Sequence, residues 1–156
     1  QNPPLRFASS CLMVADGGQA ETSADQASFE LEGVSYSGYL ATITAEAEEN
    51  LIENAILAGN GGSYFASEPA AFWLGGEYVD EKWIWTGGPE DGDEFSYTDW
   101  DTDGGGQEAG QGEAEPFLVL NMFSRDDING VWYSYDAGDT GLVRVYVIEF
   151  RPDLDV

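Results

Sequence analysis

The sequence predicts one α+β domain, and three observations carry this prediction. A chain of 156 residues can bury one true hydrophobic core, whereas two domains would each be marginal. The apolar patterns give one strand, then two helices, then several strands, an order typical of an α+β fold. The composition is that of a globular chain, and no apolar run approaches the roughly 18 residues of a membrane span. We expect the domain to cover residues 1–156, with 1–4 and 151–156 as flanking segments.

One strand and one short helix are predicted before residue 34. Leu5–Ala15 is an apolar run that ends at the turn signal Asp16-Gly17-Gly18, and we interpret it as a strand. Ser23 and Gln26 have the spacing of a capping box, which predicts a helix that Gly33 closes. Its apolar positions recur at helical spacing and are Ala24, Ala27 and Leu31.

A second helix is predicted after Thr44. Val34–Gly38 is expected to be a loop that leads to the apolar stretch Tyr39–Ile43, and Thr44 can cap the helix that follows. Three glutamates in the first turn suit the positive end of the helix dipole, and Gly59 marks the end of the helix. The predicted core face consists of Ala47, Leu51, Ile52, Ala55 and Ile56.

The second half of the chain is predicted to be strands around a long loop. The strands are Ala71–Val79, Trp83–Thr86, Phe117–Phe123, Val131–Tyr135 and Leu142–Phe150. Gly87–Glu115, here called the acidic segment, separates the second of these strands from the third. From Glu90 to its end the acidic segment has ten Asp or Glu residues and no Lys or Arg, with many glycines. Such a segment cannot pack a core of its own, so we expect a functional surface loop carried by the strands.

The net charge excludes some partners. The chain has 30 acidic and 5 basic residues and no His, a formal charge of -25. This charge repels phosphate backbones and anionic lipid, which disfavours binding to nucleic acid and to membrane surfaces, and the lack of a long apolar run excludes insertion into a membrane. Self-repulsion must be offset by salt or by bound cations. A solvated acidic surface suited to saline or extracellular surroundings and a set of carboxylates that holds Ca²⁺ both remain open, and they are compatible.

The single cysteine excludes an internal disulfide. Cys11 lies in an apolar run and is expected to be a buried small hydrophobe rather than a reactive thiol. The chain starts at Gln1 without Met or leader-like features, which we interpret as a mature or excised fragment.

A series of short motifs runs through the chain from Gly38 onward. GYLATIT at 38–44 is followed by EEN at 48–50, FWLGG at 72–76, WIW at 83–85, GPE at 88–90, FSYTDW at 95–100, VW at 131–132 and YVIEF at 146–150. In order and spacing these motifs resemble the C-type lectin-like family over roughly residues 5–150. The resemblance implies two helices that flank antiparallel sheets, paired first and last strands, and a long surface loop. In many members that loop binds Ca²⁺ and, through it, sugar hydroxyls. GYLATIT and GPE look most like bacterial secreted or adhesin-borne members, which implies a secreted or cell-surface location.

The chain departs from the family pattern in three places. The usual cysteines are missing, so packing of the tryptophans must replace the cross-links. The Glu-Pro-Asn ligand motif is not recognisable after Trp100, where Gly104–Glu108 stands instead. Where the family has Trp-Asn-Asp, the chain has Trp132-Tyr133-Ser134, so Trp132 is expected in the core while both metal-binding side chains are replaced. The resemblance therefore implies the fold but not the usual sugar-binding calcium site.

The acidic segment itself supplies candidate metal ligands. Asp99, Asp101 and Asp103 stand at alternate positions before Gly104, as at the opening of a calcium loop. Gly110 occupies the twelfth position, where an EF-hand needs Glu, and no helices flank the segment, so it is not an EF-hand. Later carboxylates that can complete a site are Glu108, Glu113 and Glu115. Solvated loop charges are the alternative interpretation. Asp126–Gly130, Asp136 and Asp139 read better as turns between strands.

Tyrosines are the candidate ligand contacts. Tyr97, Tyr133 and Tyr135 offer amphipathic rings with a hydroxyl, and Gln107 and Glu108 stand where the family has its ligand motif. The tryptophans at 83, 85 and 132 are expected in the core rather than as platforms for sugars. Catalysis finds little support, because the chain has no His and no Gly-x-Ser-x-Gly or phosphate-cradling motif, and its single Cys lacks a base.

These observations together predict an extracellular recognition module. It is expected to bind a glycan or another cell-surface ligand, with Ca²⁺ ordering the acidic segment. The alternative is a Ca²⁺-independent protein-binding or structural module of a larger bacterial surface protein, which kept the scaffold and lost the sugar site.

Overall fold

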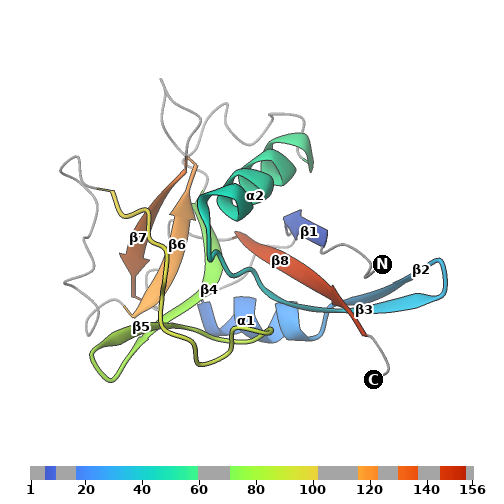
Figure 1. Ribbon diagram of the computed structural model, residues 1–156, viewed down its shortest axis with the longest axis horizontal. Coiled ribbons are helices and arrows are strands. Elements are labelled where there is room, and N and C mark those ends of the chain that lie inside the picture. The colour runs from blue at the N-terminus through green and yellow to red at the C-terminus, as the bar shows by residue number, and fades with distance from the viewer. Residues whose placement is uncertain are drawn as a thin grey trace.

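The computed structural model describes residues 6–9, 17–59, 71–101, 116–122, 130–136 and 145–153. It contains two helices and eight named strands in these ranges (Figure 1). In chain order they are β1 (Arg6–Ser9), α1 (Gly17–Asp25), β2 (Ser28–Leu31), β3 (Val34–Leu40), α2 (Glu46–Gly59), β4 (Ala71–Val79), β5 (Lys82–Trp85), β6 (Phe117–Asn121), β7 (Val131–Tyr135) and β8 (Val145–Pro152). None of the described helices is long and apolar enough to cross a membrane.

Strand β8 lies at the centre of the sheet. It pairs antiparallel with β1 and with β3, and its first residues pair parallel with β4. The full strand order is β2-β3-β8-β4-β6-β7, with β5 paired to β4 and β1 to β8. The predicted pairing of the first and last strands is confirmed, and the paired strands are antiparallel except for β4 with β8. The last strand extends to Pro152, two residues beyond its predicted end.

The two helices cover opposite faces of the sheet (Figure 1). Alternate residues of β4 point to opposite faces, so Phe72 and Leu74 join the core cluster under α2, whereas Trp73 joins the cluster under α1. Because both faces are covered, β4 is buried without interruption from Ala71 to Gly76. This is why its sequence reads as a continuous apolar run rather than an alternating one.

The first predicted helix is wrong in its position. Helix α1 ends at Asp25, and Ser28–Leu31 forms β2, which pairs with β3 in a tight hairpin. Glu32 and Gly33 form its turn with positive φ of 53° and 80°, so Gly33 serves a hairpin and not a helix end. The predicted loop Val34–Gly38 is therefore strand. Cross-strand packing favours the hairpin over the predicted helix. The rings of Phe29 and Tyr36 are stacked, with their centroids 4.7 Å apart and their planes at 5° to each other.

The second predicted helix is confirmed, but its buried face differs from the prediction. Ile52 and Ile56 are fully buried, whereas Leu51 is 60% exposed and Ala47 is exposed. Two glutamates, Glu49 and Glu53, take the places on the buried face that the prediction gave to apolar residues. Compared with the prediction, the helix is thus rotated about its axis so that Glu49 and Glu53 face the protein interior, which hydrophobic periodicity cannot reveal. At its start, the Glu48 carboxylate accepts hydrogen bonds from the Thr44 N–H and hydroxyl.

A pair of alanine substitutions tests this rotation. Ile52→Ala is expected to lower the free energy of unfolding by about 3 kcal/mol, because it deletes buried methyl groups and leaves a cavity. Leu51→Ala is expected to change it by less than about 0.5 kcal/mol, since that side chain is mostly in water. Urea unfolding of both variants measures the difference. Equal losses at the two positions would contradict the helix orientation described above.

Candidate ligand-binding face beside strand β7

Five of the predicted site residues fall in the described part of the chain. They are Tyr97, Asp99, Asp101, Tyr133 and Tyr135. The other predicted site residues lie outside the described residues: Asp103, Gln107, Glu108, Glu113 and Glu115. The predicted turn residues Asp126–Asn129 and Asp139, and the cysteine Cys11, lie outside the described residues as well. The described site is therefore the start of the acidic segment together with the strand beside it.

The start of the acidic segment runs along β7. The Trp132 N–H donates to the Asp99 carbonyl at 2.8 Å, and the Asp101 N–H donates to the Trp132 carbonyl at 3.2 Å. Trp100 lies between the two aspartates and packs its indole against two others. Its ring centroid is 5.1 Å from that of Trp83 and 5.8 Å from that of Trp132. Trp100 is thus packed against the core cluster on the α2 side. The first half of the acidic segment therefore packs against the rest of the domain through aromatic side chains.

The tryptophans predicted for the core are buried there. Trp85 and Trp132 are almost completely inaccessible, and Trp83 is nearly so. The ring of Phe95 lies 4.1 Å from that of Trp85, so the acidic segment contributes an aromatic residue to the same cluster. These rings are not available as platforms for a ligand.

The three candidate tyrosines do not share one surface. Trp132 and Ser134 point to the buried side of β7, so Tyr133 and Tyr135 point to its other face. The Tyr133 hydroxyl donates to the Asp101 carboxylate, and burial together with that carboxylate raises the pKa of Tyr133 to about 12. Tyr135 packs against the core cluster on the α1 side. The structure therefore brings Tyr133 and Asp101 together.

Tyr97 instead belongs to a buried polar contact with α2. Its hydroxyl donates to Glu49 Oε2 at 2.6 Å, and Trp132 Nε1–H donates to Glu49 Oε1 at 2.7 Å. The neighbouring Glu53 accepts the backbone N–H of Gly130. Two glutamates one helical turn apart thus tie α2 to both segments that form the site. Sequence reasoning missed them, although positions 49, 52, 53 and 56 do have the spacing of one helix face.

The carboxylates around Tyr97 form a negatively charged group. Burial raises the pKa of Glu49 to about 7, with Asp99 and Glu53 adding to the shift and the two hydrogen bonds opposing it. Burial also raises the pKa of Asp99, and the nearby Glu46 raises it further. Among the described residues, no group of three or more potential ligands is arranged to hold a metal ion. These carboxylates are close enough to repel one another but do not form a complete metal site.

A second buried carboxylate lies in β8, under the first motif of the chain. Glu149 is 1% exposed, and its Oε1 accepts the Tyr39 hydroxyl at 2.7 Å. Its Oε2 accepts the Thr42 N–H at 3.3 Å, and the Thr42 hydroxyl also donates to Glu90 at 3.2 Å. Burial raises the pKa of Glu149 to about 7, despite these hydrogen bonds. This contact joins β3, β8 and the acidic segment.

Solved structures share this architecture. The sequence matches no protein-family model and no curated protein. The fold is similar to that of the C-type lectin CEL-I from Cucumaria echinata, with a TM-score of 0.65 and 17% identity over 97% of this chain and 93% of that one. It is also similar to ovocleidin-17 of the Gallus gallus eggshell calcified layer, with a TM-score of 0.59 and 16% identity over 93% and 88%. The C-type carbohydrate-recognition domain of cow CD23 gives a TM-score of 0.52 at 18% identity over 96% and 88%.

These likenesses, together with the two helices and the mixed sheet, define a C-type lectin-like fold. The prediction of fold class is confirmed. At identities of 16–18%, these likenesses show the fold alone.

Proposed function

We propose that the protein is a recognition module that binds carbohydrate at the face formed by β7 and the acidic segment. The observation that carries the proposal is the fold, which the chain shares with a carbohydrate-recognition domain solved in the presence of the oligosaccharide GlcNAc2Man3. Tyr133 and Tyr135, which point to the same face of β7, would supply ring and hydroxyl contacts, and Gln107 and Glu108 would add polar contacts. Tyr97, the third predicted contact, lies on the other side of β7 with its hydroxyl bound to Glu49, so it would hold the acidic segment in place rather than touch the ligand. Recognition rather than catalysis is the role we infer, at the cell surface or as a secreted protein, by a single domain over residues 1–156.

Calcium is the ion proposed to order the acidic segment. Asp99 and Asp101 lie at the end of the described part of this segment. The proposed ligands further along the segment are Asp103, Glu108, Glu113 and Glu115. Charge supports this proposal, because burial raises the pKa of Asp99, the nearby Glu46 raises it further, and no described cation opposes the shift. A divalent ion would relieve that repulsion, and Ca²⁺ accepts six to eight oxygen ligands in flexible geometry.

Thermal unfolding with calcium tests this part of the proposal. Free Ca²⁺ at 100 times its dissociation constant is expected to add about 2.7 kcal/mol to the free energy of unfolding, or several degrees in melting temperature. The matched control is Mg²⁺ at equal ionic strength, because screening of the -25 charge also stabilises the protein. Asp99→Asn with Asp101→Asn should remove the calcium-specific part, and Glu30→Gln, an exposed glutamate on β2, should leave it unchanged.

A glycan array in calcium and in chelator then tests the ligand. Binding that chelator abolishes is the expected result. If no glycan binds in either condition, the carbohydrate proposal fails even where calcium raises the melting temperature.

The second candidate function is a Ca²⁺-independent protein-binding module of a larger surface protein. One observation favours it: Ser134 is completely buried and Tyr133 is bound to Asp101, so neither position after Trp132 presents a free oxygen ligand. This function is expected to show no calcium-specific shift and no glycan binding. Capture of a protein partner that is insensitive to chelator would support it.

A further inference from the structure

Two carboxylates meet at one hydroxyl near the start of the acidic segment. The Thr42 hydroxyl oxygen lies 3.4 Å from Glu149 Oε2 and 3.2 Å from Glu90 Oε2. Thr42 and Glu149 are each 1% exposed, whereas Glu90 is half-buried. The three side chains therefore form a row of oxygens that runs from β8 to the acidic segment, with almost no access to water at its inner end.

The number of hydrogens decides whether this row can hold together. A threonine hydroxyl has one hydrogen, so it can donate to only one carboxylate. When Glu149 and Glu90 are both ionised, one of the two contacts has no hydrogen, and two negative charges flank one hydroxyl. One added proton satisfies both contacts, because the Glu149 carboxyl then donates to the Thr42 oxygen while the Thr42 hydroxyl donates to Glu90.

The surroundings of Glu149 favour this proton. Burial raises the pKa of Glu149, and the negative charges of Glu48 on α2 and of Glu90 raise it further. Tyr39 on β3 donates its hydroxyl to Oε1 at 2.7 Å, which leaves Oε2 to carry the proton. Burial and the Glu149 carboxylate raise the pKa of Tyr39, and Arg151 on β8 opposes that rise. Tyr39 thus remains a donor at neutral pH, and Glu149 is the member of this pair that titrates.

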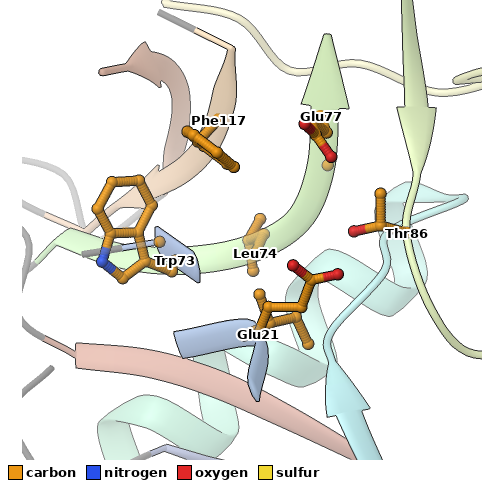
Figure 2. Close-up of a pocket in the computed structure, with 9 residues that line it drawn as sticks. Glu21, Trp73, Leu74, Glu77, Thr86 and Phe117 are labelled. Atoms are coloured by element: carbon orange, nitrogen blue, oxygen red, sulfur yellow. The ribbon is translucent and has the colours of Figure 1, made fainter. Parts of the chain in front are cut away.

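Glu90 belongs to the first turn of the acidic segment, residues 87–93, and both ends of this turn are fixed. Before it, the Thr86 N–H and hydroxyl donate to the Gly75 carbonyl at 2.6 and 3.0 Å. Figure 2 shows Thr86 lining the small cavity between α1 and β4. After the turn, the Phe95 N–H donates to the Trp83 carbonyl at 3.0 Å. Any movement is therefore confined to the turn itself.

The first turn rests on Tyr39. Its shape is held from within, because the Asp91 carboxylate accepts the Gly87 N–H at 3.0 Å. Gly88 has a positive φ of 68°, and a Cβ at this position would overlap the Tyr39 ring. The turn is thus seated on the tyrosine that is bound to the buried carboxyl, and its Glu90 side chain reaches the hydroxyl of Thr42.

We propose that Glu149, Thr42 and Glu90 form a proton-dependent latch that holds the first turn of the acidic segment closed on Tyr39. With the proton present, all three side chains are hydrogen-bonded. When the proton leaves, the Thr42 hydroxyl donates to the more deeply buried Glu149, so the half-buried Glu90 turns to solvent and the turn opens. The latch itself needs neither calcium nor sugar. Only its effect on a ligand rests on the proposed function, which would then be stronger at pH 6 than at pH 8.

A pH titration of the full chain, followed by the amide signals of its glycines in NMR spectra, tests the latch. Gly87, Gly88 and Gly92 are expected to shift together between about pH 5.5 and about pH 9, with a midpoint near the pKa of Glu149, about 7. The ratio of open to closed turn should rise about tenfold per pH unit, as for the loss of one proton. Gly33, in the turn between β2 and β3, is the internal reference and should not shift. Constant signals from the first turn would overturn the proposal.

Variants then identify the titrating group. Glu149→Gln carries an amide that donates to Thr42 as the protonated carboxyl does, so the turn should stay closed at every pH. Glu90→Gln removes the second charge and should also keep the turn closed. Asp25→Asn is the matched control, because burial and the nearby Asp91 raise the pKa of this exposed residue at the end of α1, and the wild-type midpoint is expected.

Two results with these variants would overturn the proposal. One is a transition that persists in Glu149→Gln, and the other is a transition that Asp25→Asn abolishes. The titration contains no calcium and no glycan, so its failure is distinct from a failure of the proposed function.

Discussion

Lowering the pH from 8 to 4.5 is expected to raise the melting temperature of this protein, whereas many proteins lose stability in acid. Glu49 and Glu149 both have a pKa raised to about 7, from the 4.5 of a free glutamate. A raised pKa means that the folded state binds the proton more tightly than the unfolded state does. The stabilisation from protonation is therefore complete below pH 4.5 and is lost as pH rises through 7.

The expected effect is large because both groups act in the same direction. A shift from 4.5 to about 7 corresponds to roughly 3 kcal/mol for each fully buried carboxyl, and to a melting temperature change on the order of 10 °C for the two together. Every other carboxyl pKa resolved as shifted among the described residues is also raised, namely those of Glu21, Asp25, Glu53 and Asp99. Protonation also reduces the self-repulsion of a chain with a formal charge of -25.

Calorimetry across this pH range, at fixed ionic strength, measures the effect. Glu49→Gln and Glu149→Gln should each flatten the dependence of melting temperature on pH, because each removes one titrating group. Glu30→Gln, at an exposed position on β2, should leave the slope close to that of the wild type. A melting temperature that falls steadily from pH 8 to pH 4.5 would contradict the burial of both carboxyls.

Trp132→Ala is expected to be the most damaging single substitution among the described residues. Removing a fully buried indole costs about 3 to 5 kcal/mol through lost contacts and the cavity left behind. It also leaves the Glu49 carboxylate without the Trp132 N–H, which adds roughly 1 to 3 kcal/mol. The sum is comparable to the whole stability of a typical domain, so we expect little folded protein at 25 °C.

A milder substitution separates the two contributions. Trp132→Phe keeps most of the ring and removes the hydrogen bond, and a loss of about 2 kcal/mol is expected in urea unfolding. The control is Leu51→Ala, at the residue of α2 that is 60% exposed, with an expected change under about 0.5 kcal/mol. If Trp132→Ala unfolds with the wild-type midpoint, then the tryptophan is not the centre of the core described above.

Strands with a clear apolar pattern could be predicted from the sequence, whereas the position of the first helix could not. Ala71–Val79 and Val131–Tyr135 have the predicted bounds, because long apolar or alternating runs leave few other structures open. The stretch after Ser23 offered only two alanines and a leucine at helical spacing. Strand pairing with Val34–Leu40 outweighed that local preference, and such pairing depends on residues beyond the local stretch.

The candidate site could be predicted in part from the sequence. Asp99 and Asp101 were candidate ligands from their spacing alone, and the structure joins the backbones of both to Trp132 by hydrogen bonds. The burial of the glutamates could not be predicted, because charged residues are almost never fully buried without partners. The partners of Glu49, for example, are Tyr97 and Trp132, which lie 48 and 83 residues away from it, so only the fold reveals them.

The antiparallel pairing of β1 with β8 has a consequence for attachment. Arg6 lies opposite Phe150, so the polypeptide enters and leaves the fold side by side. The end of β8 and strand β7 lie on opposite sides of the molecule (Figure 1). If the domain is attached through both of these connections, the attachment lies at one end of the molecule, and β7 lies at the opposite end, farthest from it.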